Sequence, residues 1–370
     1  MCGGLAVTRP KDEAELAEIV RNAAGPFLVR GGGTRGIGIS AAGDVLETTA
    51  LTGITLYEPG ALTLVVRSGT PLAEVEGVLS AEGQRLPFEP PDMRGLLGRD
   101  GQSTIGGVVA TNASGPRRVQ AGACRDSLIG VRFVDGTGTV VRNGGRVMKN
   151  VTGIDLVKLL AGSHGTLGVL TEVAFKLLPA PEMQATICVA GLSDAEAVAA
   201  MSAALGSPYD ITSAAHLPGR GTFVRLEGFE TSVRYRLREL TKLLGRFGPV
   251  DERGDGIWCQ VRDVTPFHAV TGDVWLLSTL ASDAPRLVAL SGAVEALYDW
   301  GGGRIWLRLE EGIDLRARLG AFQGHATRIR GAGASPAFSP EPPPLAALSA
   351  GLRAKFDPRG VFNPGLMQAA

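Results

Sequence analysis

The sequence has few of the residues that usually hold metals or structural crosslinks. Its four cysteines are scattered and form no C-x-x-C pair: Cys2, Cys124, Cys188 and Cys259. Zinc sites and iron–sulfur clusters are built on closely spaced cysteines, so this spacing favours neither. The four histidines also lack H-x-x-x-H spacing: His164, His216, His268 and His325. We therefore expect no metal site, and a structural or surface role for each histidine.

Long apolar runs and an excess of charge of one sign are also missing. No apolar run approaches the roughly 18 residues that a membrane-spanning helix needs. The first residues do not show the charged-then-apolar pattern of a signal peptide. The 37 lysines and arginines balance 37 aspartates and glutamates, so no net field attracts nucleic acid or an anionic membrane. We expect a cytoplasmic protein that has no nucleic-acid partner and associates with membranes only through other proteins.

Glycine, by contrast, is abundant, with 52 of 370 residues. A short apolar run over residues 27–29 leads into a first loop over residues 30–36, which carries four glycines. Bare glycines let the backbone adopt positive φ and approach a ligand, so that several N–H groups converge on one anion. We expect this anion to be a nucleotide pyrophosphate. Taken alone, the segment is also compatible with a flexible turn that binds nothing.

Gly31, Gly33 and Gly36 match the G-x-G-x-x-G fingerprint of Rossmann dinucleotide sites. That fingerprint requires a strand before the loop and a helix after it. Residues 37–44 are instead β-branched and broken by glycine, and residues 45–49 alternate like a strand. The loop is therefore predicted to join strand to strand, which argues against a Rossmann site.

Two further loops are rich in small residues. The second covers residues 101–116, and the third covers residues 162–169 and leads into an alternating, strand-like segment at 170–177. Three separate loops are more than one phosphate needs. A ligand as long as FAD, however, can use one loop at its pyrophosphate and the others along its ribityl chain and ring system.

In this order and spacing, the loops resemble the p-cresol methylhydroxylase (PCMH) type of FAD-binding domain of the vanillyl-alcohol-oxidase family. Residues 114–118, 125–130 and 147–155 further resemble the E subunits of bacterial glycolate oxidases. The tail, with residues 300–307, 324–327 and 355–365, resembles them as well. The resemblance is dense over residues 27–180 and 351–366 and thin between them.

The resemblance implies a two-subdomain PCMH-type FAD-binding domain at residues 1–180, and a linker with a C-terminal segment at 333–370 that packs back on it. Between them, the succession of strand and helix patterns predicts a small ferredoxin-like α+β cap at 182–332, so the expected fold class is α+β. Hydrophobic periodicity predicts helices at 10–23, 71–81, 231–247 and 345–356. It predicts strands at 62–67, 210–218, 221–228, 273–280 and 304–309. The glycines and prolines of residues 331–345 predict irregular structure.

We expect the cofactor site to combine the bare backbone of the three loops with neighbouring hydroxyl, amide and guanidinium groups. The candidate cofactor-binding residues are Arg30, Gly31, Gly32, Gly33, Thr34, Arg35, Gly36, Pro91, Asp92, Thr104, Ile105, Gly106, Gly107, Thr111, Asn112, Ala113, Ser114, Arg117, Gly165, Thr166, Leu167, Gly168 and Val169. A reduced flavin carries negative charge at its N1/C2 edge, which a cation stabilises. The candidate cations are Arg35, Arg117, Arg118 and Lys149.

The resemblance also bears on how FAD is held. Relatives that hold FAD covalently use a histidine or cysteine near the flavin. Here the first loop carries Thr34 and Arg35, and no histidine precedes residue 164. We therefore expect noncovalent FAD, with Cys124 as the one residue that leaves the point open.

The sequence says less about how a substrate would be bound. Larger relatives that oxidise 2-hydroxy acids carry a histidine-rich metal motif in the cap, and this chain has none. Arg220, Arg225 and Arg304 have the chemistry to grip a carboxylate, but nothing in their sequence setting separates them from surface arginines. No catalytic base is assigned.

Three functions remain open. The first is a flavin subunit of a glycolate oxidase-type complex, with a sister flavin subunit that oxidises a small 2-hydroxy acid and an iron–sulfur subunit that receives electrons. The second is a self-sufficient FAD-linked oxidoreductase acting on a small hydroxy acid or alcohol. The third is a scaffold that has lost the cofactor. The missing cap motif favours the first.

Overall fold

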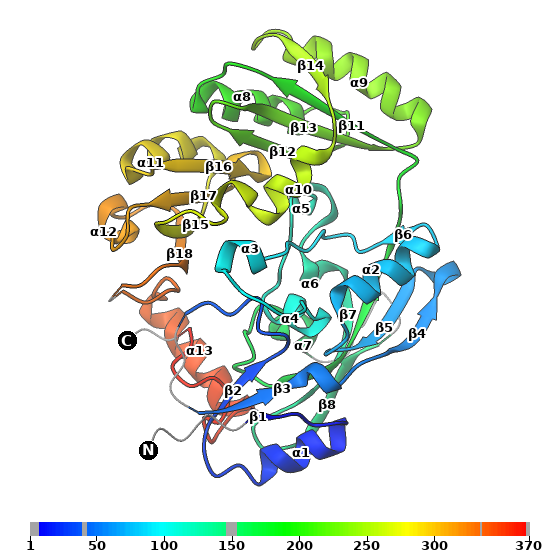
Figure 1. Cartoon of the computed structure of the whole chain (residues 1–370), viewed down its shortest axis with the longest axis vertical. Coiled ribbons are helices and arrows are strands. Elements are labelled where there is room, and N and C mark those ends of the chain that lie inside the picture. The colour runs from blue at the N-terminus through cyan, green and yellow to red at the C-terminus, as the bar shows by residue number, and fades with distance from the viewer. Residues whose placement is uncertain (1–6, 39–42, 146–153, 334, 368–370) are drawn as a thin grey trace.

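Two domains lie one above the other in the computed structural model, which describes residues 7–38, 43–145, 154–333 and 335–367 (Figure 1). We call the part from β1 to β10 the N-terminal domain and the part from β11 to β18 the cap. The C-terminal helix α13 lies beside the N-terminal domain, near β2. Among the described residues, none of the helices combines the length and apolar character that crossing a membrane requires.

The N-terminal domain contains two subdomains with separate sheets. The first has a three-stranded parallel sheet in the order β1-β3-β2, covered by α1. Its elements are β1 (Val7–Thr8), α1 (Glu13–Arg21), β2 (Phe27–Arg30) and β3 (Asp44–Glu47). The first glycine loop therefore connects strand to strand, as predicted.

The second subdomain is a five-stranded antiparallel sheet in the order β4-β5-β9-β7-β8, with a small β10-β6 ribbon beside it. Short helices cover it and bury one continuous apolar core. The elements are β4 (Ile54–Glu58), β5 (Thr63–Arg67), α2 (Leu72–Ala81), β6 (Gln84–Arg85), α3 (Arg94–Leu97), α4 (Ile105–Ala110), α5 (Arg118–Ala121), α6 (Cys124–Ser127), β7 (Leu128–Val134), β8 (Val140–Gly144), α7 (Leu156–Leu160), β9 (Val169–Lys176) and β10 (Leu178–Pro179).

The cap is one eight-stranded antiparallel sheet built from two ferredoxin-like βαββαβ units. The first unit contains β11 (Met183–Val189), α8 (Asp194–Leu205), β12 (Ile211–Leu217), β13 (Gly221–Gly228), α9 (Glu230–Leu244) and β14 (Val250–Arg253). After α10 (Gly256–Asp263), the second contains β15 (Asp273–Thr279), α11 (Ala284–Ser291), β16 (Glu295–Asp299), β17 (Arg304–Leu309), α12 (Leu315–Leu319) and β18 (Gly324–Arg330).

The strand order of the cap sheet is β14-β11-β13-β12-β16-β17-β15-β18. Counted outward from the centre of the sheet, each unit places its second, third, first and fourth strands in the same order. Each unit contributes its second strand to the seam, where His216 of β12 pairs with Tyr298 of β16. The sequence predicted ferredoxin-like elements but not this duplication, because the pairing of β12 with β16 is not encoded in either strand alone.

The C-terminal segment returns to the first subdomain. Helix α13 (Pro343–Phe356) begins two residues before the predicted position, within the stretch that we expected to be irregular throughout. The reason is that proline is tolerated in a first helical turn, where its missing N–H has no partner to lose. Beyond the helix, Phe362 bridges Phe27 in parallel, and the Phe27 N–H donates to the Val361 carbonyl at 2.7 Å. The chain end thereby extends the sheet at β2.

Candidate cofactor site

The three glycine-rich loops meet in one cleft of about 330 Å³, at the lower end of the size range of small-molecule sites. The C-terminal segment completes its wall. The predicted residues that line it are Arg30, Gly31, Gly32, Gly33, Thr34, Arg35, Gly36, Thr104, Gly106, Gly107, Thr111, Gly165, Gly168 and Val169. Loops that are far apart in sequence thus form one site.

The first loop presents bare backbone to this cleft. Gly33 adopts φ +73°, and a Cβ added to Gly33 or Gly36 would meet no protein atom within 4 Å. Among the described residues, no backbone N–H of residues 32–36 donates to a backbone carbonyl. Amides without a backbone partner, beside space that no side chain fills, fit the phosphate oxygens of a dinucleotide.

Gly31 and Gly32 are bare for a different reason, which is packing between the first and second loops. A Cβ on Gly31 would lie 2.2 Å from the Thr104 hydroxyl oxygen, and one on Gly32 would lie 1.7 Å from the Gln102 carbonyl oxygen. A side chain at either position would push the second loop away. These two glycines therefore hold the cleft wall together.

The second loop contains α4, whose N-cap is Thr104, with its Oγ1 accepting from the Gly107 N–H. The N–H groups of Ile105 and Gly106 donate to the carbonyls of Thr70 and Ser68. The first turn of α4 therefore has its amides already engaged, and the anion-binding amides of the cleft belong to the first loop. The hydroxyl of Ser68, buried in the same wall, has no hydrogen-bond partner among the described residues.

The third loop is fixed by Asn363 from the chain end. Asn363 Oδ1 accepts from the Val29 N–H at 2.8 Å, and its Nδ2 donates to the His164 carbonyl at 2.9 Å. One amide side chain thus ties β2 to the third loop. His164 itself, at φ +51°, packs edge-on against Phe338, and burial lowers its pKa to about 4, so the ring is neutral at pH 7.

Arg35 is the buried cation of the cleft. Its Nε and Nη2 donate to the Ser103 hydroxyl, and Nη2 also donates to the Pro91 carbonyl at 2.5 Å. Burial lowers the pKa of this guanidinium to about 10, so it stays charged at neutral pH. Its position fits the cation expected beside a reduced flavin.

Several lining residues were not among those predicted. They are Leu28, Val29, Ile37, Gly38, Thr48, Ser68, Arg99, Ala110, Ser163, His164, Leu170, Asn363 and Leu366. Most of these residues belong to no recognisable sequence motif, so no local signal identifies them. Ser163 and His164 lie inside the third loop, which was recognised, and Asn363 lies inside a segment matched by resemblance.

The other predicted residues lie outside the cleft lining and make structural contacts. Ile105 is fully buried, the Asp92 N–H donates to Asp263 of the cap, and the Thr166 hydroxyl donates to the Ser163 carbonyl. Asn112 Oδ1 accepts from the Arg125 N–H. The complete set outside the lining is Pro91, Asp92, Ile105, Asn112, Ala113, Ser114, Arg117, Thr166 and Leu167. Of the other candidate cations, Arg118 stacks on Trp300 of the cap, and Lys149 lies outside the described residues.

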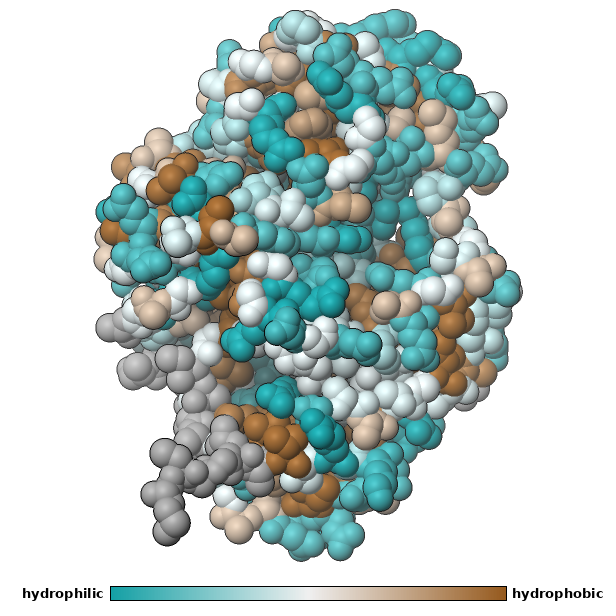
Figure 2. All heavy atoms as spheres, viewed as in Figure 1, coloured by the Kyte–Doolittle hydropathy of each residue, from teal (hydrophilic) through white to brown (hydrophobic). Residues whose placement is uncertain are grey.

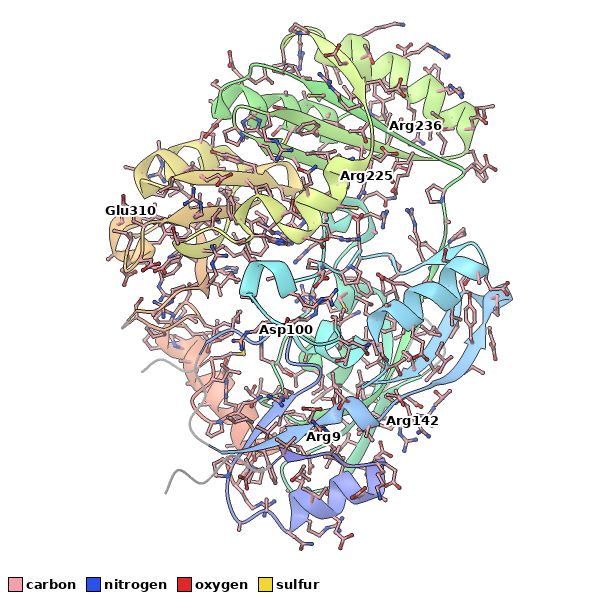
Figure 3. The ribbon with its side chains drawn as sticks, viewed as in Figure 1. Arg9, Asp100, Arg142, Arg225, Arg236 and Glu310 are labelled. Atoms are coloured by element: carbon pink, nitrogen blue, oxygen red, sulfur yellow. The ribbon has the colours of Figure 1, made fainter. Side chains whose placement is uncertain are left out.

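Two bidentate ion pairs cross the boundary between the domains. The N-terminal domain supplies the arginine of one pair, and the cap supplies the arginine of the other. Arg117 of the N-terminal domain binds both carboxylate oxygens of Glu227 in the cap, at 3.0 and 2.8 Å. In return, Arg225 of the cap binds both oxygens of Glu89, at 3.0 and 2.8 Å. Figure 3 shows Arg225 on the side of the cap that faces the N-terminal domain.

This network corrects our expectation about the cap arginines. Arg225 is 1% exposed and Arg304 is 4% exposed, so neither is a surface arginine. Arg225 donates to Glu89 and Ser213, and Arg304 Nη1 donates to the Ser114 carbonyl. Among the described residues, Arg225 Nε and Arg304 Nε and Nη2 have no hydrogen-bond partner. Arg220 is exposed and donates to Gln260. Among the described residues, none of the cap lines the cleft.

Comparison with known proteins agrees with this architecture. Residues 5–144 match a protein family described as an FAD binding domain. The chain is 36% identical over 347 residues to the glycolate oxidase subunit GlcE of Escherichia coli (strain K12), an alignment that covers 93% of each protein. It is 32% identical over 188 residues to the glycolate oxidase subunit GlcD of Bacillus subtilis (strain 168), covering 49% of this chain and 38% of that protein.

Among solved structures, an alkyldihydroxyacetonephosphate synthase superposes with a TM-score of 0.72, covering 97% of this chain and 76% of that one. At 16% identity this likeness is one of fold. The alignment with GlcE, in contrast, keeps more than a third of the residues identical across nearly the whole of both chains. The chain therefore belongs to the family of the glycolate oxidase subunit GlcE.

Proposed function

We propose that this chain binds FAD noncovalently in the cleft and acts as a flavin subunit of a glycolate oxidase-type complex. In that complex a sister flavin subunit oxidises a small 2-hydroxy acid, and an iron–sulfur subunit receives the electrons. The observation that carries the FAD part is the set of first-loop amides that no backbone carbonyl engages, beside the open space at Gly33 and Gly36. The match to FAD binding domains supports it.

FAD, when bound, supplies the ability to accept a hydride and to pass its electrons on. The chain's own residues bind, orient and shield it. The amides of residues 32–36 would hold the pyrophosphate, and Arg35 would supply positive charge from the wall. Asn363 fixes the third loop against β2.

The nucleophiles near the cleft support noncovalent attachment. Cys124 is fully buried and does not line the cleft, and burial raises the pKa of its thiol. A protonated, enclosed thiol is a poor nucleophile. His164 lines the cleft and is neutral, so it is the residue to exclude by experiment.

A role as a subunit, in place of a self-sufficient enzyme, is supported by the cap. An autonomous enzyme needs to hold its substrate carboxylate beside the cofactor. Arg225, however, is bound to Glu89, and Arg304 is buried with Nη1 on the Ser114 carbonyl. Among the described residues, none of the cap reaches the cleft lining. The self-sufficient oxidoreductase remains the second candidate, because D-lactate dehydrogenases, such as that of Anaerostipes hadrus, are among the relatives in sequence.

One set of measurements tests both parts. Purified protein should show a flavin spectrum, and acid denaturation should release all of the flavin as FAD; flavin that stays with the precipitate would overturn noncovalent binding. Glycolate or D-lactate added anaerobically to the isolated chain should leave the flavin oxidised, and addition of the partner subunits should allow bleaching. Bleaching of the isolated chain would establish the self-sufficient enzyme instead.

A further inference from the structure

Helix α13 differs from the other described helices of eight or more residues. Each of the others buries at least three residues, whereas α13 buries none along its 14 residues. Isolated helices of this length are marginally stable in water and normally depend on packing an apolar face. The fold anchors α13 at its last residue, Phe356, whose ring centroid lies 6.0 Å from that of Phe133, and buries no other part of the helix.

The exposed side of α13 is apolar. Leu345, Leu348 and Leu352 are 49%, 67% and 37% exposed, and their i, i+3, i+7 spacing places them in one stripe. Figure 2 shows that hydrophobic residues on this face of the molecule form several separate groups among polar ones, one of them in the lower part beside the grey atoms. Ala346, Ala347, Ala350 and Gly351 keep the middle of the helix free of large side chains, so another element can approach the backbone there. A stripe of this kind on a surface marks an interaction site.

The helix is held at the rim of the cofactor cleft. Before it, Phe338 packs on His164, and after it, Leu366 lines the cleft. Arg353 in the last turn donates to the Leu366 carbonyl at 2.8 Å. A protein that docked on α13 would thus lie beside the cleft, which electron exchange with a bound cofactor requires.

Charge distinguishes the possible occupants. Helix α13 has no acidic residue in its first turn, and its two basic residues, Arg353 and Lys355, are both in the last turn. A membrane-surface helix carries its basic residues along the whole polar face, so this pattern does not fit a lipid surface. It fits a protein groove that is apolar along its length and carries carboxylates at one end.

We propose that the leucine stripe of α13 is the docking surface for the electron-exchanging partner subunit, in a groove with a carboxylate rim beside Lys355. This inference rests on the proposed function, because it assumes a partner that exchanges electrons with FAD. It adds the location of the interface and the chemistry of the partner's face.

The test uses the full chain, loaded with FAD and co-expressed with the sister flavin and iron–sulfur subunits of the same genome. Leu345→Asp/Leu348→Asp should weaken the complex about a hundredfold, roughly tenfold for each buried leucine lost. The matched control is Leu290→Asp, because Leu290 is an equally exposed leucine (49%) on α11 of the cap. Flavin content and the melting temperature of both variants should match wild type, which separates lost docking from lost folding.

Each outcome decides a different point. If wild type assembles and the double variant assembles equally well, α13 is not the interface and the proposed function survives. If the double variant instead abolishes binding to vesicles of phosphatidylethanolamine and phosphatidylglycerol, or abolishes self-association, while the complex stays intact, the occupant is a membrane or a second copy. If wild type forms no complex with these subunits, the proposed function fails, and the docking surface fails with it.

Discussion

Arg304 of the cap donates a 2.6 Å hydrogen bond to the carbonyl oxygen of Ser114 in the second loop. The guanidinium lies between the rings of Trp300 and Trp306, at 4.4 and 5.0 Å from their centroids. Trp300 adds a hydrogen bond from Nε1 to the Gly115 carbonyl at 3.0 Å. The cap therefore holds the end of the same loop whose beginning forms the cofactor cleft.

Trp300→Phe should cost about 1 kcal/mol of stability, because it keeps a ring and removes one hydrogen bond. Arg304→Met should cost more, about 3 kcal/mol, because it leaves the fully buried Asp299 without its cation. Urea unfolding measures both changes. The exposed Arg220→Met is the control and should stay within about 0.5 kcal/mol of wild type. An equal loss in all three variants would show that these contacts do not hold the second loop to the cap.

Gly32→Val and Gly36→Ala should separate loop packing from ligand space. At Gly32 the new Cβ collides with the Gln102 carbonyl, so both apoprotein stability and FAD content should fall. At Gly36 the added methyl meets no protein atom, so apoprotein stability should be unchanged and only FAD affinity should fall. The flavin-to-protein ratio and the apoprotein melting temperature measure the two effects. Full FAD affinity in Gly36→Ala would mean that the cofactor does not approach this backbone.

Asn363→Ala should destabilise the protein by about 2 kcal/mol, because the Val29 N–H and the His164 carbonyl lose their partner together. Asn363→Asp should lose less, since a carboxylate still accepts from Val29 but has no hydrogen to donate to His164. FAD dissociation, followed by flavin fluorescence, should accelerate in the same order. An Asn363→Asp variant as stable as wild type would show that the contact with His164 does not matter.

Stability should fall at acid pH through Glu227. Burial raises the pKa of this carboxyl, but hydrogen bonds and charge from Arg117 outweigh burial and lower it to about 2 from an ordinary 4.5. A depressed folded-state pKa stabilises the fold above the unfolded pKa, and this contribution is lost as pH falls from 4.5 towards 2. Glu227→Gln should therefore melt well below wild type at pH 7, with a gap that narrows below pH 4.5. Melting temperatures over that range test this; a constant gap contradicts it.

The sequence was sufficient to predict those helices and strands whose hydrophobic pattern lies within the element itself. The strands predicted at 221–228 and 304–309 coincide with β13 and β17, and the helix predicted at 231–247 corresponds to α9, which ends at Leu244 before Gly245. These segments carry their own hydrophobic period. The burial and pairing of Arg225 could not be predicted in this way. Its partner Glu89 lies 136 residues earlier, and the contact exists only when the two domains are packed together.

Glycine patterns show the same limit within the candidate site. The first loop was recognised because its residues lack side chains, but the pattern does not say what occupies the space that is left. The structure assigns that space differently at adjacent positions: backbone of the second loop at Gly32, and open cleft at Gly36. Asn363 escaped prediction because its two partners, Val29 and His164, lie 334 and 199 residues earlier in the chain, in two different segments.

The bond between Asn363 and Val29 joins residues that are 334 positions apart, so it sets the time at which the site is complete during synthesis. At the usual rate of about 5–20 residues per second, β2 leaves the ribosome tens of seconds before Asn363 is made. Throughout that interval the nascent chain lacks the clamp between β2 and the third loop. Closure of this wall is therefore a late event in biogenesis, one that follows the synthesis of Asn363.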